Sequence, residues 1–170
     1  MRQRLLMVTA FAASIALLSA AWFSAPLTAA AEDPKLEQKA VIAPLELNRR
    51  KLGGLDLAAE EAFIDPSSLL GGKSSPRGEV LFRGEELIVE VYEDDAYKMA
   101  LTEPFPHDEY IHILSGELIL TDAAGVERTY TAGDSLVIPK GFTGIWQTRG
   151  IFRELVVIER KVYDATYLSE

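Results

Sequence analysis

The sequence predicts an all-β fold, and three observations support it. From about residue 80 onward, short apolar runs alternate with turn signals such as Ala132-Gly133-Asp134 and Pro139-Lys140-Gly141. The runs are rich in Val, Ile, Leu and Tyr, and Leu87–Tyr92 alternates its two faces with a period of two. The runs follow one another without helical segments between them. Strands this short and this closely spaced indicate a sandwich or a barrel.

The expected strands follow one another with turns between them. The two prolines of residues 102–108 exclude a central strand there, because proline cannot donate a ladder hydrogen bond. Ser115-Gly116 is expected to form a turn, and Asp134 to close its own turn by accepting a backbone N–H. The predicted strands are Val80–Phe82, Leu87–Tyr92, Tyr97–Leu101, Glu109–Leu114, Glu117–Thr121, Glu127–Thr131, Ser135–Ile138, Thr143–Gln147 and Phe152–Glu159.

The chain around these strands divides into simpler segments. Residues 32–79 are expected to form an N-terminal arm and loop, which precede the predicted barrel of residues 80–160 and a polar tail over 161–170. Within the first of these, helical spacing predicts a short helix over Leu55–Ile64. Gly, Ser and Pro predict a surface loop over Leu69–Gly78.

The first 31 residues have the pattern of a secretory signal peptide. Arg2 and Arg4 supply a positive start, Leu5–Phe23 is an apolar core, and Ala29-Ala30-Ala31 offers small residues where signal peptidase cuts. We expect cleavage after Ala31 and a periplasmic or secreted protein, with a retained anchor helix as the alternative. No second apolar run of spanning length follows, so no membrane contact is expected after cleavage.

Charge and cysteine content exclude several classes of partner and site. Cleavage removes two of the 17 basic residues and none of the 26 acidic ones, so the mature net charge is −11. Such a surface repels nucleic acid and anionic lipid, and neither is an expected partner. The chain has no cysteine, which excludes disulfides, thiolate metal sites and cysteine nucleophiles.

Two motifs resemble those of a known family. Glu109, with Gly116 after six intervening residues, matches the second half of the first cupin motif, and Gly133–Gly141 matches the first half of the second. Phe142–Trp146 and Arg153–Ile158 resemble the (S)-ureidoglycine aminohydrolase-like cupins (the DUF861 or Cupin_3 type). The resemblance covers Leu87–Ile158, and it implies a single cupin-type jelly-roll β-barrel whose interior holds the site.

The metal ligands that the resemblance implies are mostly missing. The usual His-x-His pair lies three or four residues before Glu109, which here falls on Glu103 and Phe105 or on Thr102 and Pro104. The histidine of the second motif falls on Gly144. A first-row metal site needs three or four converging ligands. We therefore expect a degenerate site and no metal cofactor. The alternative is a divalent Mn, Fe, Ni or Zn ion held by Glu103, His107 and Glu109.

Side chains around Glu109 are the candidate ligand contacts. His107 lies two residues before Glu109, so in an extended chain both face the same way, whereas His112 faces the other way. An unpaired buried carboxylate is costly, so Glu109 needs a partner, with Arg149 or Arg153 as protein candidates. Trp146 is expected to form an apolar wall with Phe105 and with Tyr110 or Tyr130. The candidate ligand-binding residues are Phe105, Glu109, Tyr110, His112 and Trp146.

These observations favour a protein that binds a small polar molecule inside the barrel. The resemblance also implies an alternative from another class, a metal-dependent hydrolase or lyase acting on ureido or amino compounds. Its catalytic residues are unknown, and His107 and Glu109 are the candidates for acid–base chemistry. A third alternative is a structural module that forms a homodimer through its sheets.

Overall fold

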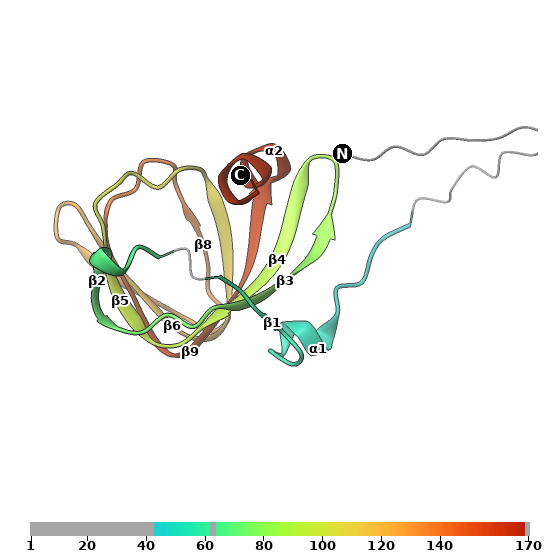
Figure 1. Ribbon diagram of the computed structural model, residues 1–170, viewed down its shortest axis with the longest axis horizontal. Helices are drawn as coiled ribbons and strands as arrows, with labels where there is room; N and C mark the ends of the chain where they lie inside the picture. Colours follow the sequence, from blue (N-terminus) through green and yellow to red (C-terminus); the bar gives the residue numbers. More distant parts are fainter. Residues whose placement is uncertain (1–42, 62–63, 169–170) are drawn as a thin grey trace, which may run out of the picture. The chain divides into compact units, whose positions relative to one another are not determined.

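The computed structural model of the protein describes residues 43–61 and 64–168. The predicted signal peptide, its cleavage site after Ala31 and the arm up to residue 42 lie outside these residues. None of the described helices has the length and apolar character needed to cross a bilayer. The elements are α1 (Arg49–Leu52), β1 (Ala58–Ala59), a 3₁₀ turn (Pro66–Ser68), β2 (Leu69–Gly72), β3 (Arg77–Arg83), β4 (Leu87–Asp94), β5 (Tyr97–Leu101), β6 (Glu109–Asp122), β7 (Glu127–Thr131), β8 (Ser135–Ile138), β9 (Gly144–Glu159) and α2 (Arg160–Tyr167) (Figure 1).

Two long strands, β6 and β9, run through both faces of a barrel. β6 and β9 pair with each other along both of their halves. The first half of β6 also pairs with β8 and the second half with β7, while the first half of β9 pairs with β5 and the second half with β4. One face therefore has the strand order β2-β5-β9-β6-β7, and the other has β1-β3-β4-β9-β6-β8. The predicted all-β jelly-roll barrel is confirmed.

β6 and β9 each replace two strands that the sequence predicts as separate. The predicted turn at Ser115-Gly116 is wrong, because β6 continues through it with shifts in its register against β9. Gly116 has φ of +75°, and a Cβ at this position would lie 2.7 Å from the carbonyl oxygen of Ile151. The glycine therefore marks a bulge inside a bent strand, where the β9 backbone comes close.

Gly116→Ala is expected to lower the free energy of unfolding by about 2–4 kcal/mol, because positive φ and backbone overlap add to each other. Gly150→Ala is the matched control. Gly150 also has positive φ (+71°), but no atom lies within 4 Å of its Cβ position. That control is expected to cost about 1–2 kcal/mol. Urea denaturation of both variants measures the difference, and equal losses would contradict the close approach of β9.

The region before β4 contains strands that the sequence does not predict. The predicted helix over Leu55–Ile64 is wrong in its described part, since Ala58 and Ala59 pair with β3. The predicted loop over Leu69–Gly78 is wrong at both ends, because β2 pairs with β5 and β3 begins at Arg77. Pairing to a sheet edge satisfies backbone groups that a short isolated helix or a loop would leave to water, and it overrides the local pattern.

The hydrophobic core lies between the two faces of the barrel. Ile111 and Ile113 of β6 meet Phe152 of β9 there, and all three are fully buried. Asp134 accepts a hydrogen bond from the backbone N–H of Thr131 at 2.7 Å, so the predicted closed turn before β8 is confirmed. The packed core fills one part of the barrel interior, and a pocket occupies another.

Candidate ligand pocket

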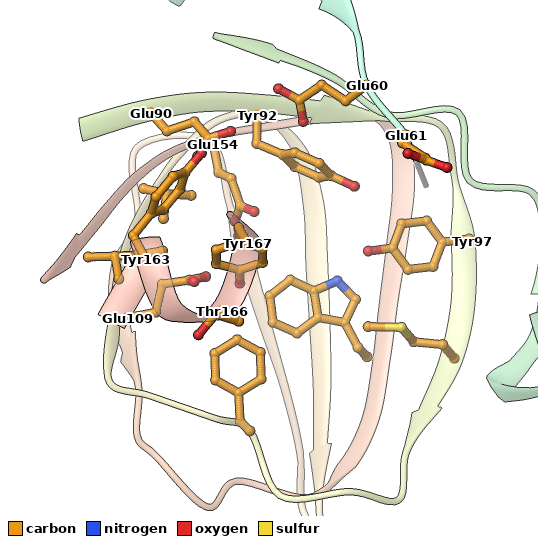
Figure 2. Close-up of a pocket in the computed structure, with 15 residues that line it drawn as sticks. Glu60, Glu61, Glu90, Tyr92, Tyr97, Glu109, Glu154, Tyr163, Thr166 and Tyr167 are labelled. Atoms are coloured by element: carbon orange, nitrogen blue, oxygen red, sulfur yellow. The ribbon is translucent and has the colours of Figure 1, made fainter. Parts of the chain in front are cut away.

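A pocket of about 490 Å³ lies inside the barrel next to α2 (Figure 2). Its walls come from β4, β5, β6 and β9, from α2, and from the chain before the 3₁₀ turn. The lining combines acidic, aromatic and aliphatic side chains. They are Glu60, Glu61, Glu90, Tyr92, Tyr97, Met99, Phe105, Glu109, Trp146, Glu154, Val156, Ile158, Tyr163, Thr166 and Tyr167.

Strand alternation directs carboxylates into this pocket from β4 and β9. Alternate residues of a strand share one face, so Glu90 and Tyr92 of β4 point inward together, as do Glu154 and Val156 of β9. The register places Tyr92 beside Glu154 and Glu90 beside Val156. Two glutamates therefore occupy inward positions on neighbouring strands.

The C-terminal helix α2 closes one side of the pocket. Tyr163 and Tyr167 lie four residues apart, on one helical face, and both line the pocket. Arg83 of β3 anchors the helix through an ion pair with Asp164 (2.6 Å), and its guanidinium lies 5.5 Å from the ring centre of Tyr163. The predicted polar tail over 161–170 is therefore a helix in its described part, and its aromatic face belongs to the pocket.

His107 and Glu109 form a buried pair at the start of β6. The two side chains face the same way, as predicted, and His107 Nε2 lies 3.1 Å from Glu109 Oε2. Glu109 lines the pocket, whereas His107 is 3% exposed and lies behind it. The predicted pairing of Glu109 with Arg149 or Arg153 is wrong, because Arg149 pairs with Glu117 and Arg153 with Glu93.

Glu154 is the most deeply buried acid of the pocket. Only 4% of its surface is exposed, and its Oε2 has no hydrogen-bond partner among the described residues. Figure 2 shows its side chain directed into the pocket. Burial raises the pKa of Glu154 well above its ordinary value, and the carboxylates of Glu109 and Glu90 raise it further.

Two other glutamates of the pocket also have raised pKa values. Burial raises the pKa of Glu90 to about 7, Glu60 and Glu109 add to the shift, and a hydrogen bond with Tyr163 opposes it. Burial likewise raises the pKa of Glu60. Several carboxylates thus share a space where they cannot all ionise without a large cost.

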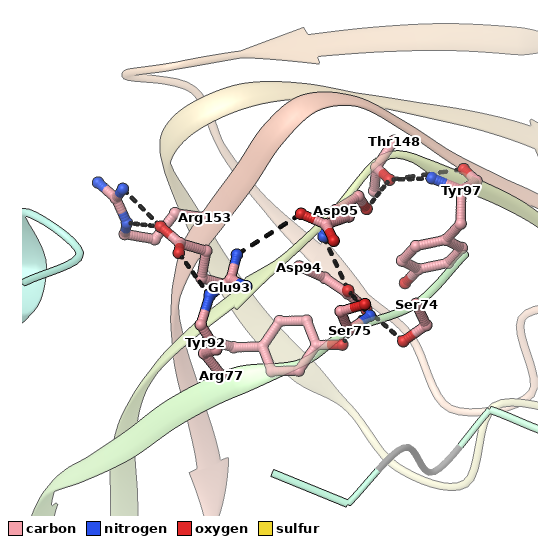
Figure 3. Close-up of polar contacts among 10 residues, drawn as sticks. All are labelled: Ser74, Ser75, Arg77, Tyr92, Glu93, Asp94, Asp95, Tyr97, Thr148 and Arg153. Carbon is pink, nitrogen blue, oxygen red and sulfur yellow. Dashed lines mark hydrogen bonds and ion pairs between the residues drawn. The ribbon is translucent and has the colours of Figure 1, made fainter. Parts of the chain in front are cut away.

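A buried network at the end of β4 holds one of the pocket tyrosines in place (Figure 3). Asp94 is fully buried. It accepts hydrogen bonds from the hydroxyls of Ser74 (2.6 Å) and Tyr92 (2.8 Å) and from the backbone N–H groups of Ser75 (2.5 Å) and Asp95 (2.8 Å). The network joins the segment before β3 to the end of β4, and it orients the Tyr92 ring toward the pocket.

The structure brings some of the predicted ligand residues together and separates others. Phe105, Glu109 and Trp146 line the pocket. Tyr110 and His112 occupy the outer face of β6, where they contact the Ser135 hydroxyl at 3.1 and 2.9 Å. The prediction that Tyr110 and His112 contact a ligand inside the barrel is therefore wrong, because both side chains point away from the pocket. The prediction that His112 faces away from Glu109 is confirmed.

Trp146 forms part of an apolar wall, as predicted, but with a different tyrosine. Tyr97 of the neighbouring strand β5 lines the pocket beside it, while Tyr130 packs against the core elsewhere. The indole N–H of Trp146 is close to the Tyr97 hydroxyl. It makes no hydrogen bond of standard geometry within the described part of the chain.

Sequence reasoning did not single out Glu90, Glu154, Tyr163 or Tyr167. A signal exists for the two acids, because Glu154 stands in one alternating row with Phe152 and Val156, and Glu90 in a row with Tyr92. The helical spacing of the two tyrosines is also visible in the sequence. What the sequence does not contain is the position of α2 over the inner face of β4 and β9.

The resemblance implies a divalent metal, and the structure separates the three ligands predicted for it. Glu103 is exposed and lies outside the pocket lining. Of the predicted ligand set, only His107 and Glu109 are in contact. In residues 43–61 and 64–168, no three His, Asp or Glu side chains are grouped so that they could hold a metal ion. Three or four converging ligands are the usual requirement.

Part of the chain matches a family model, and a solved structure shares its fold. Residues 100–163 match the family model of the EutQ-like cupin domain. A DUF861-family protein of unknown function from Pseudomonas syringae pv. tomato has 22% identity and a TM-score of 0.53 over 59% of this chain and 43% of its own length. The polyketide cyclase RemF from Streptomyces resistomycificus has 20% identity and a TM-score of 0.47, over 62% and 75% of the two chains. No protein of curated function matches.

The long strands β6 and β9, which belong to both faces, and the interior pocket place this chain among the jelly-roll barrels. Over residues 100–163 the barrel is similar to the EutQ-like cupin domain, whose family model matches there. The chain spans less than half the length of the Pseudomonas protein, and that likeness concerns the fold alone. Membership of the ureidoglycine aminohydrolase-like group stays a prediction.

Proposed function

We propose that the protein is an exported cupin that binds a small polar molecule inside its barrel without a metal. The pocket carries this proposal, because its volume of about 490 Å³ lies within the range of small-ligand sites. Buried polar atoms are nearly always hydrogen-bonded in folded proteins. Glu154 Oε2 and Trp146 Nε1 have no such partner among the described residues, and both side chains line the pocket. A polar ligand in the pocket would lie beside both side chains.

A second function is favoured by the buried pair of His107 and Glu109. Their 3.1 Å contact is within the range at which one side chain can tune another for acid–base chemistry. Glu109 faces the pocket, so its carboxylate would take the proton from a substrate while the imidazole held it in position. A hydrolase or lyase acting on ureido or amino compounds would use such a base.

A thermal-shift screen of the mature protein, after measurement of its metal content, tests these functions. We expect less than about one-tenth equivalent of Mn, Fe, Ni or Zn, and at least one stabilising compound among ureides, sugars, amino acids and amines. Near-stoichiometric metal would contradict the metal-free proposal, and a screen without any stabilising compound would contradict binding. Product formed in the same incubations, and abolished by Glu109→Gln, would favour the enzyme.

A further inference from the structure

The pocket has a strongly one-sided charge. Five glutamates line it, and none of the described residues in its lining is a lysine, an arginine or a histidine. The carboxylates come from three strands and from the chain before the 3₁₀ turn, so they converge on the pocket from separate segments. They are Glu60, Glu61, Glu90, Glu109 and Glu154.

Glu154 shows that the acidic side chains of the pocket are not all in contact with solvent. Its side chain is 4% exposed, points into the pocket, and leaves Oε2 without a hydrogen-bond partner in the described part of the protein. A buried charge without a partner costs several kcal/mol. The neighbouring carboxylates of Glu109 and Glu90 increase that cost, since they repel a charge on Glu154. A positive group in the pocket would offset both.

The remaining walls favour an organic cation over a hydrated inorganic ion. Tyr92, Tyr97 and Tyr167 line the space together with Trp146 and Phe105. Aromatic faces attract ammonium groups through the ring quadrupole, and the attraction is larger where water is excluded. The same faces also bury the carbon skeleton of a ligand.

We propose that the pocket binds a small organic amine or quaternary ammonium compound, with its cationic group held between Glu154, Glu109 and the aromatic rings. This inference rests on the proposed function, because it names the ligand class for the same pocket. An amine would donate N–H bonds to the carboxylates, and a quaternary ammonium would contact the rings. A neutral polyol, which carboxylates and aromatic rings also bind, is the competing class.

Isothermal titration calorimetry with matched probes separates the two classes. The probes are choline with its neutral carbon isostere dimethylbutanol, and putrescine with butanediol, titrated into the mature protein at low salt. Each cation is expected to bind at least about tenfold more tightly than its neutral counterpart, a difference of about 1.4 kcal/mol. Equal affinities within both pairs would overturn the cation proposal and leave small-molecule binding intact.

Variants locate the effect in the pocket. Glu154→Gln keeps the volume and is expected to weaken binding of the tighter cation by about tenfold or more. Tyr167→Leu, on α2 and outside the sheets, is expected to weaken it several-fold by removing one aromatic face. Glu117→Gln, an acid of β6 outside the pocket whose side chain is 42% exposed, is the matched control and should leave affinity unchanged. Unchanged affinity in both pocket variants would overturn the proposal, as would absence of binding by both cations. A ligand of another class in the thermal-shift screen would then preserve the proposed function.

Discussion

Asp94→Ala is expected to lower the free energy of unfolding by about 3–5 kcal/mol. The substitution removes the acceptor of four hydrogen bonds. The part-buried backbone N–H groups of Ser75 and Asp95 and the buried hydroxyl of Tyr92 would be left without this acceptor. A buried donor without a partner costs about 1–3 kcal/mol. Urea denaturation at neutral pH, followed by far-ultraviolet circular dichroism, measures the loss.

The neighbouring acid supplies the control for that experiment. Asp95 has a side chain that is 42% exposed, and its carboxylate lies 3.6 Å from Arg77. Such an exposed ion pair contributes at most about 1 kcal/mol, so Asp95→Ala should be nearly neutral. Similar losses in the free energy of unfolding for the two alanine variants would contradict the proposal that the buried network stabilises the end of β4.

The positions of most barrel strands could be predicted because their signals are local. Period-two alternation in Leu87–Tyr92 and the turn residues around Asp134 need no knowledge of a partner strand. The continuity of β6 could not be predicted in this way. The pair Ser115-Gly116 has the composition of a turn. Only the nearby β9 backbone shows that the positive φ of Gly116 belongs to a bulge.

The same distinction applies to the pocket. Glu109, Phe105 and Trp146 could be predicted because they lie in or beside recognisable motifs. Glu154 and Tyr167 enter the pocket through packing between distant segments, β9 and the helix that follows it, which no local pattern specifies. Export after Ala31 and the homodimer stay predictions.

Glu154→Gln is expected to change how stability depends on pH. The folded pKa of Glu154 is raised above its unfolded value, so its favourable contribution is complete below about pH 4.5 and is lost as pH rises toward the folded pKa. One such group produces a slope of about 1.4 kcal/mol per pH unit. Glu90 acts with the same sign between about pH 4.5 and its folded pKa of about 7. The wild-type protein should therefore lose stability between pH 5 and 7.

The amide cannot ionise, so Glu154→Gln should flatten that slope by about 1.4 kcal/mol per pH unit and be the more stable protein at pH 7. Urea denaturation at pH 5, 6 and 7 measures the two profiles. Glu159→Gln, an exposed acid on the same strand, should retain the wild-type slope. Parallel profiles for wild type and Glu154→Gln would show that Glu154 is not the buried acid responsible.

Ionisation of the pocket carboxylates destabilises the ligand-free protein, and the same ionisation should strengthen its attraction for a positive ligand. As pH rises, Glu90 and Glu154 move toward their charged forms, and repulsion among the pocket carboxylates grows. A cation that binds the folded state offsets this repulsion, so its affinity should increase over the same pH range. In Glu154→Gln, both the loss of stability and the gain in cation affinity with pH should become smaller together. A neutral ligand carries no charge to offset the repulsion among the carboxylates, so its affinity should change much less over this pH range.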